Sequence, residues 1–189
     1  RLVAAPGLDG LVRRHDRPLV GREAELATLE SLYRQVGTER TARMVTLLGE
    51  AGYGKSRLVR EVLERIAAGA RSLSGRCLPY GDGITFWPLL MMVREACGIR
   101  DSDTPEAARA RLHASVGDAE VGRRLASAAG LSSETFPLTD LNWAARKFLE
   151  GQANGGPLVV FVDDIHWAEP SFLDLLEHVQ LSAVDAPML

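Results

Sequence analysis

The sequence predicts an α/β protein in which helices cover both faces of a parallel sheet, giving a three-layer αβα sandwich. Two observations support this fold class. Short apolar runs at 42–49 and 157–164 end in glycine or in an acid, and amphipathic segments alternate with such runs along the chain. The 189 residues are 46% hydrophobic and 25% charged, which is enough for one domain with a sizeable core.

Three segments are predicted to be strands. Residues 157–164 (PLVVFVDD) form the strongest candidate, because apolar side chains fall on both faces. Residues 42–49 (ARMVTLLG) form a short apolar run that indicates a second buried strand, and 70–77 (ARSLSGRC) is a weaker candidate. Parallel strands place their carboxyl ends at one edge of the sheet, where ligands of such folds bind.

The helical predictions rest on apolar residues that recur every three or four positions. In the first helix these include Leu26, Leu29 and Val36. Helices are expected over 21–36, 54–69, 86–98, 140–153 and 170–182, with two short ones within 105–130 that separate near Gly117.

Composition excludes several classes of function. The net charge of −3 offers no basic surface, so we expect no direct nucleic-acid contact from this segment. Cys77 and Cys97 are too few for a disulfide framework and lack metal-ligand spacing, which favours free thiols in a reducing cytoplasm. No apolar run reaches membrane length, so we expect a cytoplasmic domain without membrane contact.

Both ends of the chain are expected to be cuts in a longer protein. Residues 1–17 are rich in Ala, Pro, Gly and Arg without periodicity, and they are interpreted as a linker or lead-in. The domain is predicted to cover 18–189 and to be incomplete at its C-terminus, because 187–189 resembles the entry to another strand.

The stretch LLGEAGYGKSR (47–57) contains one of the two lysines in the chain. The pattern Gly49-x-x-x-x-Gly54-Lys55-Ser56, between a predicted strand and a helix, is that of a phosphate-binding P-loop. Its glycines let backbone N–H groups turn toward phosphate oxygens, at the positive end of the following helix. Lys55 is a point charge that reaches the β- and γ-phosphates, and Ser56 offers a hydroxyl to Mg²⁺. The alternative is an accidental glycine-rich turn, which this composition makes rare.

The second stretch, LVVFVDDIHWAEP (158–170), supplies the carboxylates that a P-loop requires. A buried strand that ends at Asp163 delivers this acid to the edge of the sheet, where it would hold Mg²⁺ directly or through water. Asp164 would polarise the attacking water. Many strands end in acids at a loop, so the prediction depends on the pairing with the P-loop. Together these features predict the fold of a P-loop NTPase.

Four stretches together resemble a known family. They are LVGREAEL (19–26), GEAGYGKSRL (49–58), GRCLPYGDGITFWPL (75–89) and VDDIHWAEP (162–170). They are similar to the AAA-type ATPase domains of the STAND signalling class, and most of all to the ATPase modules of large LuxR-type regulators and of bacterial proteins with adenylate cyclase domains. The resemblance spans 18–182. The P-loop alone is shared by a vast superfamily, and the combination is far more specific.

The resemblance implies further site residues. The VGRE turn lies beside the adenine in similar proteins, and the alternative is that Gly21 is simply a turn before a helix, with Arg22 in its solvated first turn. Glu50, inside the loop, would help to position water. The nucleotide-binding residues expected from the P-loop and the resemblance together are Val20, Gly21, Arg22, Gly49, Glu50, Ala51, Gly52, Tyr53, Gly54, Lys55, Ser56 and Arg57.

The resemblance also implies partners and missing parts. ATP and ADP are the expected ligands, with Mg²⁺ as cofactor. A further strand is expected between the P-loop strand and the aspartate strand, so the domain is truncated before a sensor strand and a helical lid. An output domain elsewhere in the full chain, either a DNA-binding helix-turn-helix or a cyclase, and a homo-oligomer are expected partners.

Four functions stay open at this point. The favoured one is a switch that binds Mg-ATP and hydrolyses it slowly within a larger signalling or transcriptional regulator. The second is a nucleotide-gated scaffold without significant turnover. An initiator-like AAA ATPase acting on DNA is the third, and the stretches PYGDGITFWPL and DDIHWAEP argue against it. A small-molecule kinase is the most distant, since no second acceptor-site signature is present.

Overall fold

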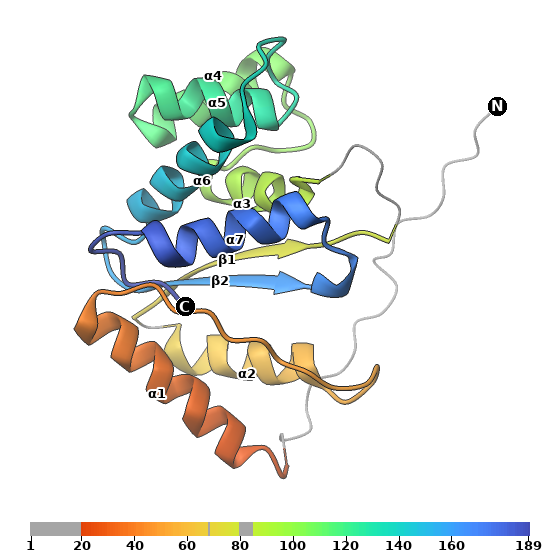
Figure 1. The fold of residues 1–189 in the computed structure, drawn as a ribbon, viewed down its shortest axis with the longest axis vertical. Helices are drawn as coiled ribbons and strands as arrows, with labels where there is room; N and C mark the ends of the chain where they lie inside the picture. The colour runs from red at the N-terminus through yellow and green to blue at the C-terminus, as the bar shows by residue number, and fades with distance from the viewer. Residues whose placement is uncertain (1–19, 68, 80–84) are drawn as a thin grey trace, which may run out of the picture.

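The computed structural model describes residues 20–67, 69–79 and 85–189. The helices form close to where the periodicity predicts them, two strands lie among them, and both short helices within 105–130 are present (Figure 1). In chain order the elements are α1 (Glu23–Glu39), α2 (Lys55–Ile66), β1 (Arg71–Arg76), α3 (Trp87–Cys97), α4 (Pro105–Val116), α5 (Ala119–Ala128), α6 (Leu138–Gln152), β2 (Leu158–Asp163), the short 3₁₀ helix η1 (Ile165–Trp167) and α7 (Pro170–Ser182).

The sheet lies between two layers of helices. Strands β1 and β2 pair in parallel, from Arg71 opposite Leu158 to Arg76 opposite Asp163. Helices α1 and α2 lie on one face of the sheet, α3 and α7 lie on the other, and α4 and α5 lie farther out beyond α3 (Figure 1). The α/β class with a parallel sheet is therefore confirmed, and the weak strand candidate at 70–77 is β1.

The last residues of the chain bridge two segments of the sheet edge. Met188 forms parallel bridges to Ala42 on one side and to Leu158 on the other. The amide of Arg43 donates to the carbonyl of Met188 at 2.9 Å, and the amide of Val160 donates to the carbonyl of Leu189 at 2.8 Å. Residues 187–189 thus lie between the P-loop segment and β2, as the resemblance implied.

The prediction of a buried strand over 42–49 is wrong for most of its length. The segment forms no regular strand, and Met44, Val45 and Leu48 are exposed, the last of them to 89%. The ladder contacts with 187–189 reach only as far as Arg43, and among the described residues no ladder hydrogen bond is made beyond this point. Met44, Val45 and Leu48 therefore lack the cover of a regular sheet, and composition alone could not show this.

The buried apolar side chains form two clusters of unequal size. The larger one fills the space between the sheet and α3, α6 and α7, and it extends out to α4 and α5. Its fully buried members include Leu73, Phe172 and Leu175. The smaller cluster joins α1 to α2 through Leu26, Leu29, Leu58 and Val62, with Leu47 and Ile66 packed against it.

Close backbone packing places β1 against α3. A Cβ atom added at Gly75 would lie 2.6 Å from the carbonyl oxygen of Pro88 and 2.8 Å from its Cβ. Glycine at this position lets the first turn of α3 lie directly on the strand. The end of β1 is thereby fixed relative to the larger core.

Candidate functional site

The P-loop residues lie between the exposed segment 43–48 and helix α2. Gly54 is the N-cap of α2 with φ +77°, and Gly52 has φ +85°, conformations that residues with a Cβ rarely adopt. The Nζ of Lys55 donates to the carbonyl oxygens of Gly49 at 2.7 Å and of Glu50 at 3.0 Å. The lysine charge therefore lies inside the curve of the loop, at the amino end of α2.

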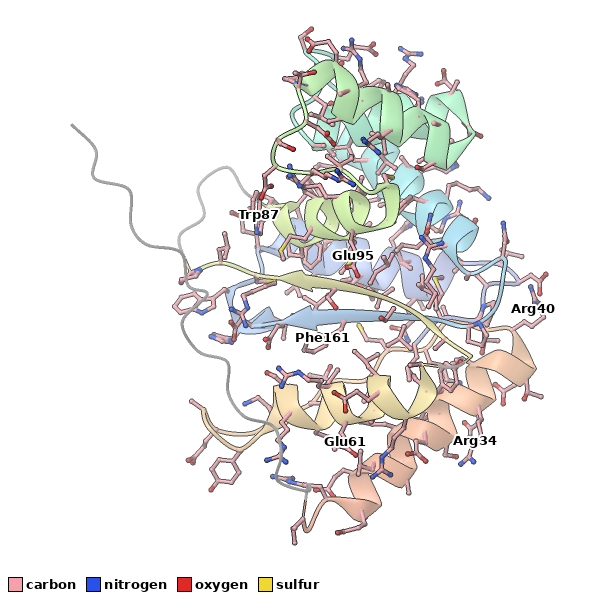
Figure 2. The ribbon with its side chains drawn as sticks, turned by 180° about the vertical axis from the view of Figure 1, so that it is seen from behind. Arg34, Arg40, Glu61, Trp87, Glu95 and Phe161 are labelled. Atoms are coloured by element: carbon pink, nitrogen blue, oxygen red, sulfur yellow. The ribbon has the colours of Figure 1, made fainter. Side chains whose placement is uncertain are left out.

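The structure brings the first acid of β2 to the loop. The Ser56 hydroxyl lies 3.4 Å from both Oδ1 and Oδ2 of Asp163, although the two residues are 107 positions apart. Asp163 ends β2, and its side chain shares the sheet face of Phe161, which is turned toward α2 (Figure 2). The parallel strand thus carries the carboxylate to the start of the P-loop helix.

This pair of residues suits magnesium. A hydroxyl and a carboxylate are hard oxygen donors, and Mg²⁺ is usually held by one or two carboxylates together with substrate phosphates rather than by an all-protein cage. In the described residues no group of three or more His, Cys, Asp or Glu side chains could hold a metal ion. Ser56 and Asp163 could therefore hold Mg²⁺ when phosphates supply the remaining ligands.

Asp164 has an unusual backbone conformation. It adopts φ +56° and ψ +38°, in the left-handed region, and starts the 3₁₀ helix η1. Its amide donates to Oδ1 of Asp163 at 3.1 Å. A non-glycine residue in this region is uncommon and costs about 1 kcal/mol or more, so the turn at Asp164 is held by its surroundings.

An arginine that the sequence analysis did not single out contacts both acids. Arg76 ends β1 directly opposite Asp163 in the parallel register. Its Nη2 donates to Oδ2 of Asp163 at 3.0 Å, and its Nε lies 3.5 Å from Oδ2 of Asp164. Arg76 stands in the stretch GRCLPYGDGITFWPL (75–89), but only the register of β1 against β2 places its side chain beside the acids.

The Arg22 side chain contacts the P-loop directly. Its Nη2 donates to the carbonyl oxygen of Tyr53 at 3.2 Å, and its Nη1 pairs with Glu25 at 2.7 Å. Gly21 has φ +75°, and Val20 is 79% exposed. The VGRE turn therefore meets the P-loop through a direct hydrogen bond.

Two further contacts join loops at the same edge of the sheet. The Thr85 hydroxyl donates to the carboxylate of Glu169, which precedes α7. The amide of Cys77 donates to the carbonyl oxygen of Asp163 at 3.0 Å. Burial raises the pKa of the Cys77 thiol, and the negative charge of Asp164 adds to this effect, so the thiol stays neutral. Residues 80–84 of the quoted motif lie outside the described residues.

Further residues of the quoted motifs lie on the P-loop, at the start of α2 and on η1. Tyr53 is 60% exposed, and His166 and Trp167 lie side by side on η1 with ring centroids 5.1 Å apart. Glu50 and Ala51 are exposed on the loop, and Arg57 lies in the first turn of α2.

Comparison with known proteins identifies the family. The model of the AAA ATPase domain matches residues 18–184. The chain belongs to the AAA ATPase domain family. Domains of this family have the P-loop α/β fold. Membership of the family indicates that the chain binds and hydrolyses a nucleotide, and such domains generally use Mg²⁺ with ATP.

One relative shows how such a domain occurs in a longer chain. An uncharacterized protein of Rhizobium meliloti (strain 1021) is 35% identical over 185 residues, which covers 91% of this chain and 18% of that protein. The chain therefore spans about a fifth of its relative's length. No solved structure matches the chain. None of the helices in the described part of this AAA ATPase domain is both long and apolar enough to cross a bilayer.

Proposed function

We propose that this AAA ATPase domain binds Mg-ATP and hydrolyses it slowly, as a nucleotide-dependent switch within a larger signalling or transcriptional regulator. The observation that carries the proposal is the contact between the Ser56 hydroxyl and the Asp163 carboxylate, at 3.4 Å. The neighbouring Lys55 directs its amino group at the carbonyl oxygens of the P-loop. Nucleotide binding follows from the loop, and the switch role follows from the resemblance to LuxR-type and cyclase-linked regulators.

Each residue at the site has a proposed role. Loop amides from Gly49 to Ser56 would surround the phosphates, and Lys55 would exchange its two backbone carbonyl acceptors for β- and γ-phosphate oxygens. Ser56 and Asp163 would hold Mg²⁺, which supplies charge stabilisation to the transferred phosphoryl group. Asp164 would accept a proton from the attacking water.

The adenine would lie near the VGRE turn. Val20 is exposed and would supply apolar contact, while Gly21 lets the backbone approach the base. Arg22 would act through the loop, because its guanidinium is bonded to the carbonyl of Tyr53. The domain would thus report its nucleotide through a connected set of loops, which is what a switch requires.

A nucleotide-gated scaffold without significant turnover is the second candidate. The observation that favours it is the position of Asp164, whose carboxylate lies 3.5 Å from Nε of Arg76. The guanidinium lies against the carboxylate that would have to reach the attacking water. Whether turnover occurs therefore depends on whether this pair separates when nucleotide binds.

The test measures Mg-ATP binding and multiple-turnover phosphate release. Lys55→Ala should lose most of its ATP affinity, whereas Lys147→Ala removes the other lysine of the chain, on α6, and should bind as the wild type does. Asp164→Asn should bind ATP but release phosphate at least tenfold more slowly. Binding without turnover in the wild type would select the scaffold, and equal binding by wild type and Lys55→Ala would refute the proposed site.

A further inference from the structure

One arginine meets two aspartates where β1 and β2 end. Both oxygens of Asp163 are in use: Oδ1 accepts from the amide of Asp164 at 3.1 Å, and Oδ2 accepts from Nη2 of Arg76 at 3.0 Å. The same guanidinium reaches Asp164 through Nε, at 3.5 Å. One arginine therefore spans the two acids assigned to metal binding and to water activation.

The position of Arg76 is fixed by the backbone rather than by chance contact of long side chains. Arg76 is paired with Asp163 in the parallel register, so the two side chains leave neighbouring strands on the same face. Gly75, the preceding residue, lies against Pro88 and anchors the end of β1 to α3. The arginine cannot move away with its strand, and only its side chain can release the acids.

A guanidinium and a magnesium ion cannot share this carboxylate without cost. Mg²⁺ needs its directly bound oxygen ligands about 2.0–2.1 Å away, and a second positive charge hydrogen-bonded to the same carboxylate opposes its arrival. The Arg76 side chain is 57% exposed, so solvent is available to it when it is displaced. The Asp163 side chain is 22% exposed, and it is the less accessible partner of the pair.

We propose that Arg76 competes with Mg²⁺ for the Asp163 carboxylate, and that its guanidinium holds both acids until magnesium and nucleotide displace it. The inference rests on the proposed function and adds a regulatory residue to it. Arg76 is a positioning residue rather than a catalytic one: it sets the magnesium concentration at which the site fills, and it releases Asp164 in the same step.

The test is a magnesium titration with a nucleotide that is not hydrolysed. The fluorescence anisotropy of mant-ADP is followed as Mg²⁺ is added to wild type and to Arg76→Gln. The variant should reach half-saturation at about two- to fivefold less Mg²⁺, the effect expected for loss of an exposed ion pair. Arg109→Gln removes the same charge from the exposed surface of α4 and should leave the midpoint unchanged.

Two additional readouts keep the result unambiguous. Arg76→Lys keeps the charge but has one cationic nitrogen where two now reach two acids, so its midpoint should lie between those of wild type and Arg76→Gln. In the wild-type protein, the NMR signal of the Arg76 Nε–H should shift with Mg-ADP and stay in place with ADP and EDTA. Circular dichroism shows whether each variant is folded.

The outcomes separate the two proposals. A wild type that binds no mant-ADP at any Mg²⁺ concentration would overturn the proposed function and this inference with it. Wild-type binding with an unchanged or higher midpoint in folded Arg76→Gln would overturn this inference alone. An Arg76 Nε–H signal that does not shift with Mg-ADP, although mant-ADP binds, would also overturn it.

Discussion

Replacing Gly75 with alanine should destabilise the domain through a single methyl group. The added Cβ would lie 2.6 Å from the Pro88 carbonyl oxygen and 2.8 Å from its Cβ, distances that real Cβ atoms essentially never show. Helix α3 cannot simply move outward, because Leu89, Met92 and Val93 bury its inner face in the larger core. Overpacking of this kind costs about 1–3 kcal/mol.

The assay is thermal unfolding followed by circular dichroism. For a domain of this size each kcal/mol lowers Tm by about 2–4 °C, so Gly75→Ala should melt about 2–12 °C below the wild type. The matched control is Gly151→Ala in α6, where an added Cβ meets no heavy atom within 4 Å. This control should stabilise the helix by about 0.5–1 kcal/mol. A Tm for Gly75→Ala at or above that of the wild type would refute the packing argument.

Two further predictions concern single side chains. Asp118 accepts hydrogen bonds from the amides of Glu120 and Val121 at the start of α5, so Asp118→Ala should cost about 0.5–2 kcal/mol in urea unfolding; a loss within error of zero would show that the cap contributes nothing. Burial raises the pKa of Glu150, but hydrogen bonds from Lys147 and Arg146 and from a backbone amide outweigh it, so the pKa lies below the ordinary 4.5. This stabilisation is present above about pH 4.5 and is lost as pH falls through the lowered pKa. Wild type should therefore exceed Glu150→Gln in Tm at pH 7, and the gap should close toward pH 3; a constant gap would contradict the assignment.

The spacing of apolar residues predicted the helices and β2 because these elements depend on patterns within their own segments. Residues 158–163 are apolar on both faces and form β2, and Gly117 ends α4 in the left-handed conformation, as a C-terminal glycine should. Residues 42–49 have a similar composition, yet Leu48 is exposed. The two segments differ in their sheet neighbours: β2 is paired with β1 along its whole length, whereas 42–49 is paired only near Arg43. The sequence of a segment does not reveal which strands lie beside it.

The candidate site divides in the same way. The P-loop and Asp163 were predictable because a glycine pattern and an acid at a strand end have local meanings, although their roles in binding stay predictions. Arg76 was not predictable, since only the register of β1 against β2 shows that it lies opposite Asp163. The bond from Arg22 to the Tyr53 carbonyl was missed for a related reason: it joins two loops whose separation no local pattern reveals.

The unequal size of the two apolar clusters has a consequence for motion. Helices α1 and α2 are joined by four buried side chains, whereas α3, α6 and α7 share the much larger cluster. Segments with few buried contacts open locally at a lower free-energy cost, so backbone amides of α1 and α2 should exchange with solvent sooner than those of α6. The P-loop leads directly into α2, so it belongs to the part of the domain that opens first. A nucleotide held there would protect these two helices against opening before it protected the rest of the fold.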